Sequence, residues 1–197
     1  MRSLQVTPAP QTGHRDIDGQ VRTLFAIANE VLFSKGLAES PDQFRHALRF
    51  FVAYLSYHFA SEEVAMAESS YPAGLVHADF HQYVLHEATA IEERGMREGS
   101  SVEARHRLLR MVEDWLYYHV KEDDWQFADF LSETPAKREI ARLPGICDLR
   151  ASGLLPRDFD DQMLKQLAEL GHPERRPRIP QRNESSPRAE HEDATRA

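Results

Sequence analysis

Apolar positions in this chain recur at steps of three and four residues in four successive segments, which is the period of an amphipathic helix. The first segment begins at Asp16 or Asp18, either of which could cap the helix, and ends near Gly36. The other three run from Ser40-Pro41 to about Ser69, from about Ala73 to Arg97, and from about Val102 to Leu131. The connections between them are short, which favours antiparallel neighbours. The pattern therefore predicts an all-α fold, an up-down-up-down antiparallel four-helix bundle.

The bundle accounts for only part of the chain. We expect an irregular N-terminal arm over residues 1–15, the bundle over 16–134, a C-terminal extension over 135–171 and a disordered tail over 172–197. One short amphipathic helix is predicted in the extension, where the apolar residues are Phe159, Met163, Leu164, Leu167 and Leu170. We expect this helix to pack on the bundle, and the alternative is that it binds a protein partner.

Six polar side chains continue or border the apolar stripes of three helices, where a soluble bundle normally places hydrophobic residues. They are His58 and Glu62 on the second helix, His77 and His81 on the third, and His119 and Asp124 on the fourth. A single buried histidine is more often a hydrogen-bonded core residue than a metal ligand. Three such groups on adjacent helices favour a metal site, because a buried glutamate without a cation costs several kcal/mol, on the order of what forces protonation.

The types of ligand narrow the choice of metal. Imidazoles and carboxylates together suit iron, zinc or copper, and a carboxylate can bridge two ions. Four imidazoles and two carboxylates are more than one tetrahedral zinc ion requires. The pattern therefore favours a pair of iron ions inside the bundle.

The spacing on the fourth helix does not fit an ideal α-helix. The regular stripe there passes through His119 and Asp123, and Asp124 lies beside it. Five residues along an ideal helix turn the side chain by about 140° from its starting direction. His119 and Asp124 would therefore serve different sides of the site, unless the helix is locally distorted between them.

Composition excludes several other classes of protein. The chain has 197 residues and a net charge of −8, without a basic stripe in the part expected to fold, which disfavours nucleic acid as a partner. No apolar run approaches the ~20 residues of a membrane helix, so no membrane association is expected. The N-terminus lacks the apolar stretch of a signal peptide, and the lone Cys147 excludes an internal disulfide framework. We expect a cytoplasmic protein.

These motifs resemble the hemerythrin family, its bacterial members in particular, over roughly residues 12–131. The matching segments are Asp16-Ile-Asp-Gly-Gln, Tyr57-His-Phe-Ala-Ser-Glu-Glu-Val-Ala-Met66, Tyr71-Pro72 with His77 and His81, and Trp115-Leu-Tyr-Tyr-His119 with Asp124. The resemblance implies two non-haem iron ions with an oxo or hydroxo bridge, which bind O2 or another small diatomic molecule or anion. It also implies that His77, His81 and His119 ligate the first iron, that His58 ligates the second, and that Glu62 and Asp124 bridge them.

The chain departs from the family pattern at one ligand. Where the family has a histidine on the first helix, this sequence has Val21, which cannot coordinate a metal. The second iron would then keep an additional position for water, a small anion or another side chain. His14 lies about 10 Å upstream along the axis if that segment is helical, and could reach the site only if the chain bends inward at Gly13. A plain loop histidine is the favoured interpretation of His14.

The resemblance and this departure together suggest a function. A dry pocket for O2 is expected beside the second iron, lined by Val21, Leu24, Phe25, Leu55 and Leu116. We expect a protein that binds O2 or senses O2 or redox state, without being an enzyme. One alternative is a di-iron enzyme with peroxidase, NO or iron-handling chemistry. Another is a metal-poor bundle that acts through its C-terminal extension.

Overall fold

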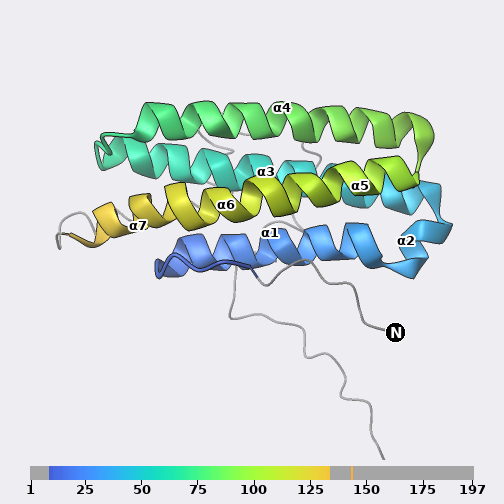
Figure 1. The fold of residues 1–197 in the computed structure, drawn as a ribbon, viewed down its shortest axis with the longest axis horizontal. Helices are drawn as coiled ribbons and strands as arrows, with labels where there is room; N and C mark the ends of the chain where they lie inside the picture. Colours follow the sequence, from blue (N-terminus) through green and yellow to red (C-terminus); the bar gives the residue numbers. More distant parts are fainter. Residues whose placement is uncertain (1–8, 134–142, 144–197) are drawn as a thin grey trace, which may run out of the picture.

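Four long helical rods lie side by side along the molecule, with consecutive rods antiparallel (Figure 1). The computed structural model describes residues 9–133 and residue 143. The rods are α1 (Arg15–Phe33), α3 (Pro41–Glu68), α4 (Gly74–Glu98) and a fourth that begins with α5 (Val102–Arg110) and ends with α7 (Trp125–Ser132). The short helix α2 (Lys35–Glu39) joins α1 to α3. The predicted all-α bundle with up-down-up-down order is confirmed.

The first helix differs from its prediction at both ends. Neither Asp16 nor Asp18 caps it, because His14 is the N-cap and its Nδ1 accepts a hydrogen bond from the Ile17 amide at 3.5 Å. The Asp18 carboxylate instead accepts from the Thr12 amide at 2.7 Å and so holds the N-terminal arm. At the other end α1 stops at Phe33, and Gly36 lies within α2.

The ends of the next two helices follow the sequence signals. Ser40 caps α3, since its hydroxyl accepts from the Gln43 amide, and Pro41 occupies the first turn, where its missing N–H costs nothing. Gly99 ends α4 with a φ of 70°, a conformation that glycine adopts without steric strain. Because these ends are fixed, the histidines on α3 and α4 are held at defined heights along the bundle.

The fourth rod is not a regular α-helix. Two segments, η1 (Met111–Leu116) and η2 (Val120–Asp124), adopt π-helical geometry, with the short helix α6 (Tyr117–His119) between them. In a π-helix the backbone bonds join residues five apart, so positions five apart face the same way. The prediction that left open a local distortion between His119 and Asp124 is therefore confirmed.

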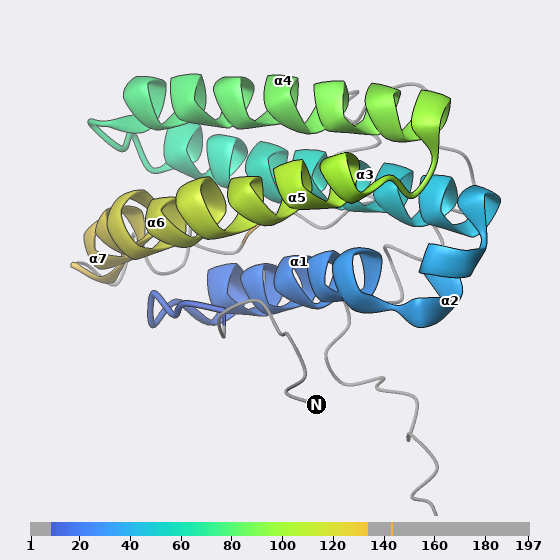
Figure 2. The same ribbon diagram turned by 45° about the vertical axis from the view of Figure 1, so that its right-hand side comes forward.

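Large apolar side chains fill the space between the rods. Figure 2 shows α1 and α4 on opposite sides of the pair formed by α3 and the fourth rod, and α3 packs most extensively against α4 and then against α1. The largest fully buried side chains include Tyr54, Phe44, Phe51, Phe59 and Phe127. Leu143 is also buried in this core. The rest of the predicted extension over 135–171 and the tail over 172–197 lie outside the described residues, so these two predictions stay untested.

Two glycines within helices give opposite expectations for replacement by alanine. A Cβ at Gly95 would lie 2.5 Å from Leu48 Cδ2, and Leu48 is itself buried, whereas a Cβ at Gly19 would meet nothing closer than 3.9 Å. Gly95→Ala is therefore expected to lower the free energy of unfolding by about 1–3 kcal/mol through overpacking. Gly19→Ala should raise it by up to about 1 kcal/mol through helix propensity. Urea unfolding of the metal-free protein measures both, and equal effects of the two changes would contradict the packing described here.

Candidate metal centre

Five of the six predicted polar residues converge in the middle of the bundle. Each of them offers a nitrogen or oxygen atom within 4.8 Å of the atoms that the others offer, and all five are buried: Glu62, His77, His81, His119 and Asp124. The sixth, His58, is also buried and lies at the edge of this group, with its Nε2 3.7 Å from Glu62 Oε1. The structure therefore brings together the groups that the three helical patterns predicted.

Three imidazole nitrogens meet at an unusually short separation. His119 Nε2 lies 3.1 Å from His77 Nε2 and 3.1 Å from His81 Nε2. Three nitrogens facing one another cannot all be satisfied by hydrogen bonds, because each contact would need its own proton. Two nitrogens bound at about 2.1 Å to one ion at a right angle would lie about 3 Å apart. The separation thus fits three ligands of one metal ion.

The two carboxylates lie between the imidazoles. Glu62 directs Oε1 toward His58 and Oε2 toward His81, and Oε2 lies 3.5 Å from His81 Nε2. Asp124 Oδ1 lies 3.0 Å from His119 Nε2 and 3.2 Å from His77 Nε2. A carboxylate with its two oxygens directed to different sides is suited to bridging two metal ions.

The carboxylate oxygens at the centre have no hydrogen-bond donor among the described residues. Both oxygens of Glu62 and both of Asp124 are fully buried and accept no hydrogen bond from the described residues. Nδ1 of His77 is likewise buried without a hydrogen-bond partner among them. Leaving a buried carboxylate such as that of Glu62 without a donor costs several kcal/mol, on the order of the penalty for an unpaired buried charge. A cation coordinated by these oxygens removes that penalty, so the residues present fit a metal site.

The π-helical segment η2 explains how His119 and Asp124 reach the same side. Asp124 is completely buried, while the side chain of Asp123 is 45% exposed and its Oδ2 lies 3.0 Å from His119 Nδ1. The sequence pattern had placed Asp123 on the core stripe and Asp124 beside it, and this assignment is wrong. It assumed 100° per residue, whereas a π-turn takes more residues than an α-turn and so brings positions five apart to the same side.

Oxygen acceptors behind the histidines fix the orientation of their rings. His58 donates through Nδ1–H to Gln20 Oε1 at 3.0 Å, and His81 donates through Nδ1–H to Glu63 at 3.1 Å. His119 donates in the same way to Asp123. In each ring this leaves Nε2 facing the centre, which is the arrangement typical of metal-ligating histidines. Gln20 and Glu63 were not predicted, although both adjoin predicted positions in the sequence.

The protonation states follow from burial and from the carboxylates. Burial lowers the pKa of His58 to about 4 and lowers that of His81 well below its usual range. Burial also acts to lower the pKa of His119, but the carboxylates of Asp124 and Asp123 outweigh it and raise this pKa to about 10. Burial and the neighbouring Asp124 raise the pKa of Glu62 well above its usual range.

Loading of metal at neutral pH is therefore expected to release protons. With a pKa of about 10, His119 is protonated at pH 7 without metal, and it must lose a proton from Nε2 before it can bind an ion. His58 and His81 are already neutral at that pH and contribute none. A pH indicator in weakly buffered anaerobic solution measures the release on addition of ferrous iron. Metal uptake with no proton release would contradict the assignment of His119 as a ligand.

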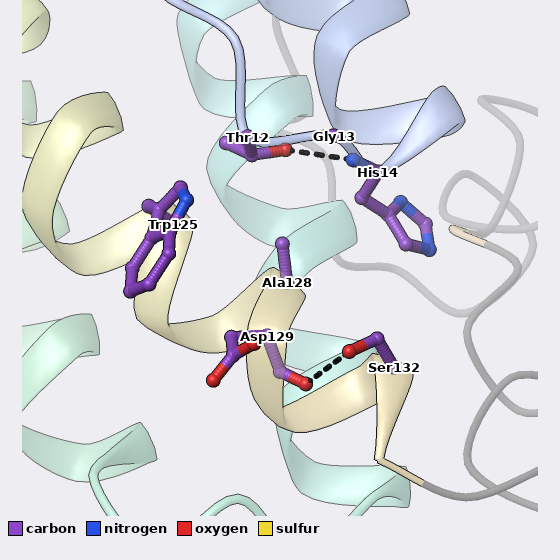
Figure 3. Close-up of a pocket in the computed structure, with 7 residues that line it drawn as sticks. All are labelled: Thr12, Gly13, His14, Trp125, Ala128, Asp129 and Ser132. Carbon is purple, nitrogen blue, oxygen red and sulfur yellow. Dashed lines mark hydrogen bonds between the residues drawn. The ribbon is translucent and has the colours of Figure 1, made fainter.

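The structure places His14 outside the metal centre, and the predicted O2 pocket stays untested. His14 caps α1 and lines a surface pocket with Thr12, Trp125 and Asp129 (Figure 3), and none of the six predicted ligands lines this pocket. Its Nδ1 is used by the Ile17 amide, so the structure does not bring His14 to the metal centre as a ligand. The predicted pocket residues are all buried in the hydrophobic core: Val21, Leu24, Phe25, Leu55 and Leu116.

Comparison with known proteins agrees with this geometry. The model of the hemerythrin HHE cation binding domain matches residues 12–131, which is more than half of the chain. The chain belongs to the hemerythrin family. A bacteriohemerythrin from Stenotrophomonas maltophilia (strain R551-3) is 31% identical over 78 residues, which are 40% of this chain and 49% of that relative. The alignment thus spans about half the length of the relative. No solved structure matches the chain.

The hemerythrin match covers both the bundle and the residues of the metal centre. All six predicted ligands, together with Gln20 and Glu63, lie within the matched residues 12–131. Among the described residues, no helix is both long enough and apolar enough to cross a membrane. The expectations of a cytoplasmic location and of a protein partner for the extension stay untested.

Proposed function

We propose that this hemerythrin-family protein holds two non-haem iron ions, with an oxo or hydroxo bridge, and binds O2 or senses O2 or redox state there. The ligands would be His77, His81 and His119 for the first ion and His58 for the second, with Glu62 and Asp124 shared between them. The observation that carries the proposal is the convergence of three Nε2 atoms on two buried carboxylates that have no donors among the described residues.

Two separate ions account better for the site than a single ion does. His58 is divided from His77, His81 and His119 by the Glu62 carboxylate, whose oxygens lie 3.7 Å from His58 Nε2 and 3.5 Å from His81 Nε2. One ion close enough to the three clustered nitrogens would leave His58 without a metal contact. A second ion between His58 and Glu62 would be coordinated by the His58 imidazole and by Oε1 of Glu62.

The protein supplies the positions of the ligands and the surroundings in which they act. Two ferrous ions, when bound, would supply the electrons that O2 takes up. The buried apolar residues Leu24, Leu55 and Leu116 would restrict the access of water and protons to the second ion. The chain offers no nitrogen ligand at Val21, so this ion would keep an additional position for water or a small anion. We expect this opening to favour oxidation of the irons over reversible storage of O2.

Stopped-flow mixing of the anaerobic diferrous protein with O2 tests the proposed function. The expected result is rapid conversion to the diferric form, followed through its near-ultraviolet absorption, without a long-lived oxygenated species. An oxygenated species that lasts for many minutes would contradict the sensing bias and favour O2 storage. Absence of any O2-dependent spectral change in protein that contains iron would overturn O2 binding itself.

A further inference from the structure

A series of aromatic rings leads from one predicted ligand to the surface of the bundle. Phe80 on α4 stacks on the His119 ring, with 4.6 Å between centroids and 17° between planes. Tyr83, one turn further along α4, lies 6.4 Å from Phe80, and Trp115 on η1 lies 5.0 Å from Tyr83. We call Phe80, Tyr83 and Trp115 the ring path. It reaches the surface at Tyr83, which is 49% exposed.

Another aromatic contact at the site does not lead from a predicted ligand to the surface. Phe59 stacks on the His81 ring at 3.9 Å, but Phe59 is almost completely buried and belongs to the hydrophobic core. The ring path instead leads from the buried His119 to the exposed Tyr83 and the half-buried Trp115, so its outer members are a tyrosine and a tryptophan. These are the side chains that lose an electron most readily among the aromatic residues, whereas a path built only for packing has no need of them.

We propose that the ring path carries electrons between the metal centre and the surface, an inference that rests on the proposed iron site. In one direction, electrons move from the surface end of the ring path to the metal centre. Hydrogen peroxide reduced at the centre takes up two electrons and two protons, its O–O bond breaks, and it leaves as two water molecules. When the irons are already ferric, the electrons come from Tyr83 and Trp115, each of which loses one electron and one proton from its O–H or N–H group.

A one-electron donor in solution, such as ascorbate, would then reduce the two ring radicals and restore both side chains. The surface end of the path thus allows a donor that cannot enter the bundle to return electrons to the buried centre. Its physiological role would be to keep the site from being damaged by peroxide or to reset it after oxidation.

The chain provides matched controls, because its two tryptophans differ in their connection to the site. Trp125 follows Asp124 directly in the sequence, is 49% exposed, and lies at the pocket of Figure 3, which no member of the ring path lines. Tyr118 precedes His119 directly, is 55% exposed, and packs on Tyr117. Radicals that escape into solvent would attack Trp125 and Tyr118 at least as readily as the half-buried Trp115.

The experiment is peroxide treatment of the full-length diferric protein, followed by mass-spectrometric mapping of oxidised residues. Iron per chain is measured first, so that failure to load iron counts against the proposed function and is kept apart from this test. The expected result is oxidation several-fold higher at Trp115 and Tyr83 than at Trp125 and Tyr118, suppressed by ascorbate and absent in the zinc-loaded protein. Equal oxidation of the two tryptophans, or more at Trp125, overturns the ring path.

Two variants locate the path within the structure. Phe80→Leu removes the ring that contacts His119, and Tyr83→Leu removes a ring that contacts no predicted ligand. In protein that retains its iron, each should reduce Trp115 oxidation several-fold and leave Trp125 oxidation unchanged. If Phe80→Leu fails to bind iron, Tyr83→Leu alone decides the question. Undiminished Trp115 oxidation in Tyr83→Leu contradicts the path.

Discussion

Glu62→Gln is expected to make the metal-free protein more stable and to make iron binding fail. In the metal-free protein both oxygens of Glu62 are buried without a hydrogen-bond donor among the described residues, and the amide removes the cost of ionising this group as the pH rises to neutral. The free energy of unfolding should rise by about 1–3 kcal/mol, the scale on which buried unpaired charges destabilise proteins. With iron, the same change removes a shared ligand, and the iron content should fall from about two per chain to one or fewer.

The gain in stability should depend on pH in a definite direction. Burial raises the pKa of Glu62 in the folded protein, so folding favours its protonated form, and the wild type loses stability as the pH rises above the ordinary glutamate range. The variant does not titrate there. The stability difference should therefore be largest at neutral pH and shrink toward pH 4.5, the ordinary value for glutamate. Urea unfolding of both metal-free proteins across this range measures it.

Glu63→Gln is the matched control for this prediction. Glu63 is the next residue on α3, its side chain is 32% exposed, and it contacts His81 only through Nδ1. A glutamine keeps an oxygen acceptor for that nitrogen, so iron content should stay near two per chain. Equal loss of iron in the two variants would show that Glu62 has no special place at the centre.

Val21→His is expected to lengthen the life of an oxygenated species in the iron-loaded protein. Val21 is completely buried on α1, and the neighbouring Gln20 contacts His58 directly, so this part of α1 lies beside the proposed ligand of the second ion. A histidine there would supply the nitrogen that the family pattern has at this position and close the additional coordination position. Oxidation by O2 should then become several-fold slower in stopped-flow absorption.

Val31→His controls for the burial of an imidazole on the same helix. Val31 is also completely buried on α1, three turns from position 21. Both variants should lose stability without metal, by about 1–3 kcal/mol, the usual scale for burying an unpaired polar group. Only Val21→His should change the optical spectrum and the O2 reaction. An unchanged O2 reaction in Val21→His, or the same change in both variants, would remove Val21 as the cause of the sensing bias.

The order of the helices and the identity of the central residues could be predicted from the sequence, because both depend on helical periodicity. His58 and Glu62 continue a stripe that begins at Phe44, and a stripe of this length leaves little freedom in which face is buried. The local irregularities could not be predicted in this way. The π-turn at Val120–Asp124 changes the angle per residue, and so exchanged the expected places of Asp123 and Asp124.

The contacts behind the ligands also depend on the distances between helices, which periodicity does not contain. Gln20 reaches His58 from α1, and the two residues are 38 positions apart in the chain. Glu63 reaches His81 from the neighbouring helix in the same way. His14 is the opposite example, because this candidate ligand instead caps the helix beside it and accepts a hydrogen bond from the Ile17 amide.

Iron analysis of protein purified without oxygen, combined with the optical spectrum after exposure to air, tests the central claim most directly. We predict close to two irons per chain and the near-ultraviolet absorption of an oxo-bridged diferric pair in the wild type, and the loss of both in Asp124→Asn. One metal ion per chain or none, or a wild-type spectrum that survives Asp124→Asn, would contradict a two-iron centre at these residues.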